Sequence, residues 1–139
     1  MDATCLSMRF SFSSAHRVRF SGTYGSVHGH NYDVTIRICV KGKRDLVLDI
    51  DKVRQGVQPI IASFEGKYLK STTEDALGIG PSEYVEVPCI PEGVTGECVA
   101  WYLLDHVRKL LSDMGIKDLV EVQVVVCDSP LNCFEARSS

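Results

Sequence analysis

Apolar and polar residues alternate along much of the first forty positions of the chain. Beyond residue 30 every second position is apolar over a long stretch, at Tyr32, Val34, Ile36, Ile38 and Val40. A period of two is typical of a half-buried strand, in which alternate side chains share one face. Phe10 and Phe12 alternate with serines in the same way, which predicts an earlier strand that ends near His16. The loop of residues 22–27 allows these two strands to pair antiparallel.

Helical spacing replaces this alternation in two later segments. Apolar residues three and four positions apart predict a helix over about residues 51–64, after a short strand end at residues 45–50. Asp49, just before this helix, is expected to be a cap or turn residue. A second helix is predicted from Thr95 to about Met114, with Gly115 as its stop. Residues 71–91 contain several glycine and proline breakers and are interpreted as a loop within the domain.

Alternation returns near the C-terminus, where residues 119–127 predict a strand, residues 128–132 a turn and residues 133–136 a closing strand. The element order is therefore strand, strand, helix, helix, strand, strand. This order predicts an α+β fold, with a four-stranded antiparallel sheet and two helices on one face. All 139 residues are assigned to a single domain, residues 1–139.

Composition narrows the possible partners and location. The chain is 45% hydrophobic and 24% charged, which suits one soluble domain. Its net charge of −3 and pI near 5.8 give no electrostatic reason to expect nucleic-acid binding. No apolar run approaches a membrane span and the N-terminus has no signal pattern, so no membrane partner is predicted and the cytoplasm is the expected location.

The six cysteines have no Cys-x-x-Cys spacing. Several lie within apolar strand or helix patterns, so most are expected to be buried thiols that behave as small hydrophobic residues. A disulfide between strands is the alternative for a protein from a hyperthermophile.

Three of the four histidines are candidates for metal ligands. His28 and His30 are two positions apart on a predicted strand and therefore project from one face, and antiparallel pairing places His16 across from them. Three neutral imidazoles with an open fourth position form the ligand set of a catalytic zinc site. The alternative is that they are solvent-facing or satisfied core histidines. His106 is expected to lie outside the cluster, in a surface or capping role.

The sequence resembles the 6-pyruvoyltetrahydropterin synthase family, which includes the 6-carboxytetrahydropterin synthases of the queuosine pathway. The matching blocks follow one another in chain order at residues 12–16, 28–32, 46–50, 95–97 and 126–129. The resemblance implies that His16, His28 and His30 bind Zn²⁺. It also implies the tunnelling fold, in which subunits join their sheets into an oligomeric barrel. A homohexamer with a pterin substrate bound between subunits is therefore expected.

The resemblance further implies a substrate site on the pterin side. Thr95 and Glu97 would border the pterin pocket, although a glutamate is also favoured in the first turn of a helix. Asp128 and Ser129 form a shortened version of the family's Glu-Thr pair, which anchors the pterin ring. A carboxylate at Asp128 can accept two N–H bonds from a guanidine-like pterin edge. The alternative for Asp128 is a turn residue.

The family's proton-transfer residues are altered in this chain. Gly22, Thr23 and Tyr24 stand where relatives carry a cysteine base, and in the aspartate–histidine block Glu65 replaces the aspartate and Gly66 the histidine. Tyr24 and Glu65 are therefore the candidate catalytic bases. Their alternatives are an aromatic plug over the pocket and a solvated carboxylate at a helix end.

Two functions follow from this combination of kept and altered residues. The first is a zinc-dependent lyase that acts on dihydroneopterin triphosphate or a close pterin, of the 6-pyruvoyl- or 6-carboxytetrahydropterin synthase type. The second is a catalytically silent or divergent zinc-containing protein that binds a pterin or purine.

Overall fold

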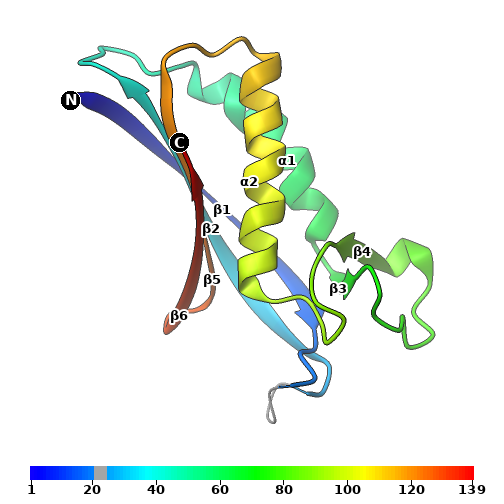
Figure 1. Ribbon diagram of the computed structural model, residues 1–139. Helices are drawn as coiled ribbons and strands as arrows, with labels where there is room; N and C mark the ends of the chain where they lie inside the picture. The colour runs from blue at the N-terminus through cyan, green and yellow to red at the C-terminus, as the bar shows by residue number, and fades with distance from the viewer. Residues whose placement is uncertain (21–24) are drawn as a thin grey trace.

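The computed structural model describes residues 1–20 and 25–139. Within these residues one six-stranded sheet is accompanied by two α-helices and a short 3-10 helix (Figure 1). The elements in chain order are β1 (Ala3–His16), β2 (His28–Lys41), α1 (Ile50–Phe64), β3 (Lys67–Ser71), η2 (Pro81–Glu83), β4 (Tyr84–Val87), α2 (Gly96–Asp113), β5 (Leu119–Ser129) and β6 (Asn132–Ser138). The α+β class predicted from the sequence is confirmed.

The sheet is larger than the four antiparallel strands that the sequence predicts. Its strand order is β4-β3-β1-β2-β5-β6. The four long strands β1, β2, β5 and β6 pair antiparallel as expected, whereas β3 pairs parallel with both β1 and β4. Strand β3 was not predicted from the sequence. Its residues 68–71 are all buried, so the strand lacks the alternation of buried and exposed positions that marks a half-buried strand.

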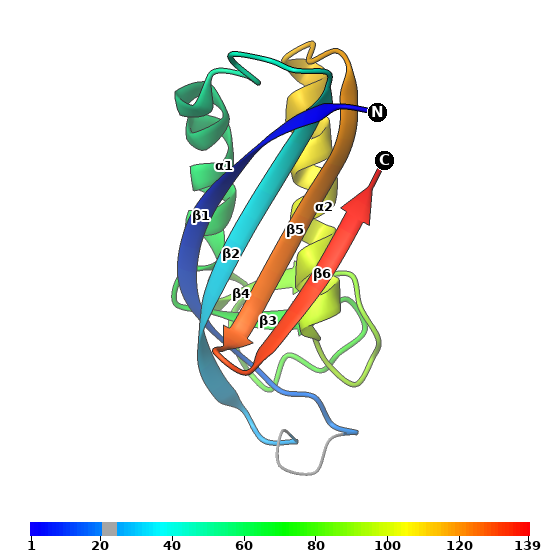
Figure 2. The ribbon, with the colours of Figure 1, turned by 90° about the vertical axis from the view of Figure 1, so that its left-hand side faces the viewer.

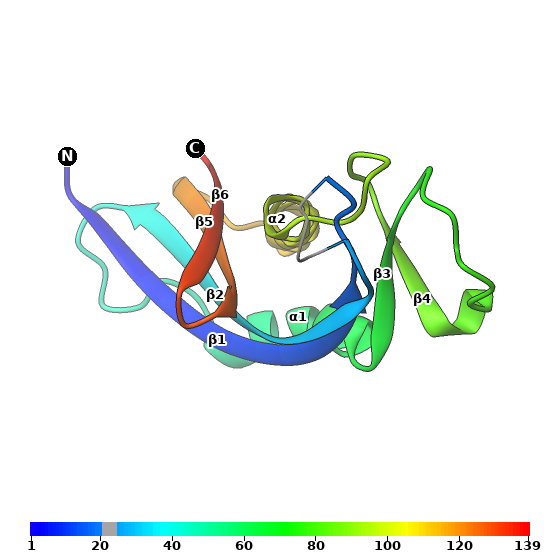
Figure 3. The ribbon, with the colours of Figure 1, turned by 90° about the horizontal axis from the view of Figure 1, so that it is seen from below.

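Both helices cover the same face of the sheet, as predicted (Figure 2). The apolar positions of β1 and β2 point toward them, and Ile36 and Ile38 in the middle of β2 have no exposed surface. Figure 3 shows that the sheet curls around this helical layer. Among the described residues, neither helix is long and apolar enough to cross a membrane.

The starts of both helices are capped by side chains. The Asp49 carboxylate accepts hydrogen bonds from the backbone N–H groups of Asp51 and Lys52, which confirms its expected cap role. The short strand predicted at residues 45–50 is wrong, because this segment is an irregular connection that leads into the cap. The side chain of Thr95 accepts a hydrogen bond from the Cys98 N–H and so caps α2 close to the predicted start.

The cysteines are not the buried free thiols that the sequence favours. All six lie in the described residues and form three disulfides, Cys5–Cys39, Cys89–Cys98 and Cys127–Cys133. Two of these bridges join residues that are directly opposite each other on neighbouring antiparallel strands. Strand pairing places these thiols together, and pairing was not visible from cysteine spacing alone.

Candidate metal centre and the adjoining cavity

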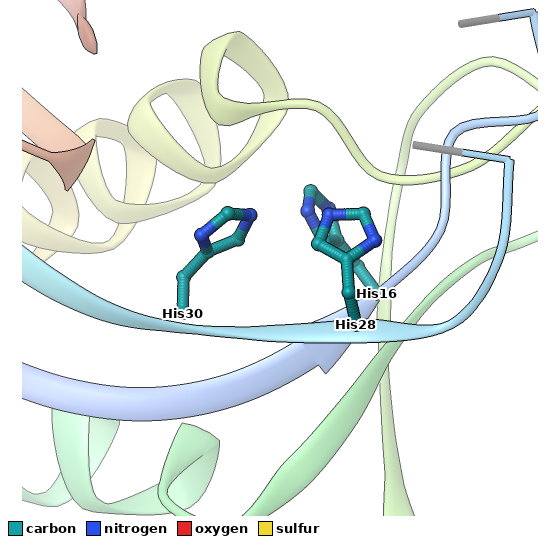
Figure 4. Close-up of side chains that lie close together, drawn as sticks. All are labelled: His16, His28 and His30. Carbon is teal, nitrogen blue, oxygen red and sulfur yellow. The ribbon is translucent and has the colours of Figure 1, made fainter. Parts of the chain in front are cut away.

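Three histidines converge at the end of the β1–β2 hairpin. The strand register places His16 directly opposite His28, and His30 follows two positions later on the same face. Their ring centroids are 4.6 to 5.0 Å apart, and the nearest ligand atoms of the three residues all lie within 4.8 Å of one another. Figure 4 shows the three rings grouped on one side of the strands. The predicted cluster is present.

Backbone carbonyl groups orient the histidine rings. The Nδ1 atom of His16 lies 2.6 Å from the carbonyl oxygen of Val94, and Nδ1 of His28 lies 2.8 Å from the carbonyl oxygen of Ser26. A carbonyl can only accept, so each of these Nδ1 atoms carries the proton and leaves Nε2 as the lone-pair donor. Such outer contacts are typical of metal-binding histidines.

Two of the three histidines, His16 and His30, favour the neutral form that a metal requires. Burial lowers the pKa of His16 below its ordinary value of 6.5, and the nearby His28 and His30 lower it further. Burial also lowers the pKa of His30. Within the described residues, the buried Nε2 atoms of His16 and His30 have no hydrogen-bond partner. A buried polar atom without a partner is costly unless something binds it.

This donor set fits a divalent metal such as zinc. Three imidazole nitrogens with one position left for water or substrate are the arrangement of a catalytic zinc site, whereas structural zinc sites use four protein ligands. His106 lies elsewhere, on α2, where its ring packs against Tyr102. Its predicted place outside the cluster is confirmed.

A cavity of about 260 Å³ opens beside the histidines. Its lining residues come from the end of β1, the start of α2 and the β5–β6 hairpin: His16, Val18, Phe20, Thr95, Gly96, Glu97, Asp128, Asn132 and Phe134. The structure therefore brings together three of the four predicted substrate-binding residues, Thr95, Glu97 and Asp128. The buried Oδ1 atom of Asp128 has no hydrogen-bond partner within the described part of the chain. The cavity thus offers a ligand an unpartnered carboxylate oxygen of Asp128, in addition to the Glu97 side chain.

The other predicted residues lie away from this cavity or outside the described residues. Ser129 does not line the cavity, and its hydroxyl oxygen accepts a hydrogen bond from the Leu131 N–H at 3.1 Å. Glu65 follows the last residue of α1, and its Oε2 atom accepts from the Ser13 N–H at 2.6 Å. Tyr24 falls within residues 21–24, which the structure does not describe.

Sequence reasoning missed several residues that shape the site. Asn132 and Phe134 line the cavity from β6, and the carbonyl of Val94 holds His16. The Tyr32 hydroxyl is buried without a partner in the described residues, and burial raises its pKa, with Asp128 adding to the rise. Only Tyr32 carried a usable signal, since it shares the parity of the histidines. The others depend on contacts between segments far apart in the chain.

The fold and the site together define an α+β protein with a cluster of three histidines that could hold a metal, beside a small cavity. The chain belongs to the 6-pyruvoyl tetrahydropterin synthase family, whose model matches residues 5–139. The family resemblance seen in the sequence is therefore confirmed.

One curated relative comes from Archaeoglobus fulgidus and carries the name "Putative 6-carboxy-5,6,7,8-tetrahydropterin synthase". It is 34% identical over 65 residues, which cover 46% of this chain and 56% of the relative. The match thus spans little more than half the length of that protein.

Solved structures of 6-pyruvoyltetrahydropterin synthases share the fold over nearly the full length. A catalytic-residue mutant of the Plasmodium vivax enzyme superposes with a TM-score of 0.82 at 18% identity, covering 100% of this chain and 99% of that one. The Plasmodium falciparum protein gives a TM-score of 0.81 at 16% identity and covers 98% of both chains. The Caenorhabditis elegans protein gives 0.65 at 20% identity, covering 100% of this chain and 98% of that one.

Proposed function

We propose that this chain is a zinc-dependent lyase of the tetrahydropterin synthase type, acting on dihydroneopterin triphosphate or a close pterin. The observation that carries the proposal is the shared cavity. His16 of the metal cluster lines it together with Thr95, Glu97 and Asp128, so a ligand held by the carboxylates would lie next to the metal position. At about 260 Å³ the cavity is close to the lower end of ligand pockets, roughly 300 Å³, which suits a small bicyclic ligand.

In this proposal, different residues of the chain bind the pterin, hold the metal and accept the proton. Asp128 accepts N–H groups of the pterin ring, a directional contact that fixes which edge of the ring enters the cavity. Glu97, in the first turn of α2, lines the same cavity. His16, His28 and His30 hold the metal, and bound zinc supplies Lewis-acid polarisation of substrate oxygens. A positioned base must still accept a proton from the substrate, and Glu65 and Tyr24 remain the proposed candidates.

A second candidate function has its own supporting observation. The Glu65 carboxylate is engaged by the Ser13 N–H and does not line the cavity, and Gly66 offers no side chain in place of the family histidine. This favours a catalytically silent or divergent zinc-containing protein that binds a pterin or a purine.

Incubation of the zinc-loaded protein with dihydroneopterin triphosphate separates the two functions. Mass spectrometry should detect loss of triphosphate or shortening of the pterin side chain, and protein treated with EDTA should form neither product. The pterin should also quench the fluorescence of the protein in a saturable titration. Saturable binding without product identifies the silent protein, and the absence of both contradicts a pterin function of either kind.

We also propose a homo-oligomer, a hexamer built from barrel-forming trimers. Strands β4 and β6 end the sheet, so within the described residues each has one edge without a pairing strand. Such edges are normally covered or paired. Light scattering at micromolar concentration tests this, and a clean monomer contradicts it. The cytoplasm remains the proposed location, and a disulfide-rich chain fits it in a hyperthermophile.

A further inference from the structure

Two of the three disulfides enclose the segments that form the substrate side of the cavity. Thr95, Gly96 and Glu97 lie between Cys89 and Cys98, which are nine positions apart. Asp128 and Asn132 lie between Cys127 and Cys133, which are six positions apart. Five of the nine cavity-lining residues are therefore inside a short disulfide-closed loop. The third bridge, Cys5–Cys39, encloses much of the β1–β2 hairpin, with a separation of 34 residues.

The first loop has little regular structure of its own to hold it. Residues 88–95 connect β4 to α2 without helix or strand. Thr95 is fixed at the junction, because its hydroxyl oxygen accepts from the Cys98 N–H at 3.3 Å and lies 3.6 Å from the sulfur of Cys89. The Cys89–Cys98 bridge therefore ties both ends of this loop together at the residue that caps α2. The same loop carries Val94, whose carbonyl orients His16.

The second loop is the tip of an edge hairpin. Within the described residues, strand β6 is the last strand of the sheet and pairs with β5 alone. Near the tip the β5–β6 register shifts between Cys127 and Ser129, so the ladder is irregular where Asp128 lies. An edge hairpin with an irregular end is expected to fray. The Cys127–Cys133 bridge closes the hairpin directly below this point.

The first disulfide-closed loop also contacts the residue that follows the second one. A Cβ atom built on Gly96 would lie 2.0 Å from a ring carbon of Phe134, so the glycine packs flush against this ring. Phe134 directly follows Cys133. Gly96 on one wall of the cavity therefore packs against Phe134 on the other.

We infer that Cys89–Cys98 and Cys127–Cys133 are positioning disulfides, which hold Thr95, Glu97 and Asp128 in the geometry that binds the pterin. The inference rests on the proposed pterin function. Holding a binding loop in its bound conformation strengthens binding because the ordering cost is met before the ligand arrives. Opening either bridge should therefore weaken pterin binding. Opening Cys127–Cys133 should leave the zinc content unchanged, whereas opening Cys89–Cys98 also frees the loop of Val94, which orients His16.

The Cys5–Cys39 bridge is a matched control within the same chain. Cys39 is nine residues along β2 from His30, which corresponds to roughly 30 Å of extended strand. Its side chain also points to the opposite face of the sheet from the histidines. Because it closes the longest loop, it should contribute most to the stability of the chain. Loss of Cys5–Cys39 should therefore lower the stability most and the pterin affinity least of the three bridges.

The experiment compares three double variants of the zinc-loaded full chain, C89S/C98S, C127S/C133S and C5S/C39S. Biopterin, a fluorescent pterin that carries no triphosphate, serves as the probe, and its Kd is measured by titration. Zinc content and circular dichroism are recorded for each variant, together with the thermal midpoint Tm. Each of the two pocket variants should bind biopterin about tenfold more weakly than the wild type, and the zinc content of C127S/C133S should be unchanged. C5S/C39S should keep the wild-type Kd within about twofold and show the largest fall in Tm.

Reduction of the wild type with tris(2-carboxyethyl)phosphine provides the same comparison without substitution. Cys133 is exposed and Cys89, Cys98 and Cys127 are half-buried, whereas Cys39 is buried. The reduced protein should lose about tenfold in biopterin affinity and recover it on reoxidation. Equal affinity in the reduced wild type, or a Kd in both pocket variants that matches C5S/C39S, overturns the inference. If the wild type binds no pterin at all, the proposed function is contradicted. The inference about the disulfides is then contradicted as well, because it rests on that function.

Discussion

The Nδ1 atom of His16 lies 2.6 Å from the carbonyl oxygen of Val94, a residue 78 positions later in the chain. This contact joins His16, the member of the histidine cluster on β1, to the loop that precedes α2. The next residue of that loop, Thr95, caps α2 and lines the cavity. The orientation of a proposed metal ligand and the shape of the proposed substrate wall are therefore set by the same short segment.

Removal of one imidazole should empty the metal site. His28→Ala leaves two nitrogen donors of three, and we expect near-complete loss of zinc because tight tetrahedral binding needs the full protein ligand set. Metal analysis of the purified protein by mass spectrometry measures the stoichiometry. His106→Ala, which changes a histidine outside the cluster, is the matched control and should keep its zinc. Stoichiometric zinc in the His28 variant would remove these histidines as the ligand set.

The two cavity carboxylates should contribute to pterin affinity without affecting the metal. We expect Asp128→Asn to weaken biopterin binding roughly 10- to 100-fold, because a hydrogen bond to a charged group contributes about 1.5–3 kcal/mol. Glu97→Gln should weaken it less, since Glu97 is exposed at its helix end. Zinc content should stay unchanged in both. Asp113→Asn, at the exposed far end of α2, provides the control, and equal affinities in all three variants would contradict a pterin site here.

Local patterns predicted much of this structure. The alternation in β1 and β2 fixed both their pairing and the shared face of the histidines, because the side-chain period of a strand is two. The same reasoning located α2 within a residue at its start, through the Thr95 cap. Substrate-side residues 95, 97 and 128 were reached only through the family resemblance, and their meeting in one cavity required the structure.

The failures have a common physical cause, which is dependence on distant contacts. The buried run of β3 has no alternation, so its pairing with β1 could not be read from its own residues. The Cys5–Cys39 bridge arises from a strand register that spans the whole hairpin. Phe134 enters the cavity because β6 folds back along β5 to meet Gly96, and no local signal at either residue indicates this.

Acid should destabilise the metal-free protein. Burial lowers the pKa of His16 and of His30 from 6.5 in the folded state, so an unfolded chain takes up protons first as the pH falls. Stability from keeping these rings neutral is therefore complete above pH 6.5 and is lost as the pH falls toward the lowered folded values. Asp128, whose negative charge favours the protonated rings, opposes this effect only in part.

Urea unfolding in the presence of EDTA, from about pH 8 to about pH 5, measures this dependence. His16→Gln removes one of the shifted groups and should flatten the profile, whereas His106→Gln should leave its shape intact. A wild-type profile that stays flat below pH 6.5 would show that the cluster does not resist protonation.

The identity of the catalytic base can be tested with two conservative substitutions. Each of the six cysteines is in a disulfide, so a thiol like that of the family cannot be the base while these bridges are intact. Tyr24→Phe keeps the ring and removes the hydroxyl. Glu65→Gln removes the charge and keeps an oxygen that can accept from the Ser13 N–H. Substitution of the true base should lower turnover roughly 100-fold or more, because general base catalysis typically contributes 10²–10⁴-fold.

The measurement is kcat with dihydroneopterin triphosphate at constant zinc content, with Asp113→Asn as the control. The case for Glu65 as the base is the weaker one on geometry, because Glu65 follows the end of α1 and does not line the cavity beside His16. If Glu65→Gln lowers kcat while biopterin affinity is unchanged, this carboxylate must reach a substrate, and the exposed position points to the site of a neighbouring subunit. If both variants keep wild-type turnover, neither residue is the base. A hydroxide bound at the metal, or another group from a partner subunit, then becomes the proton acceptor to test.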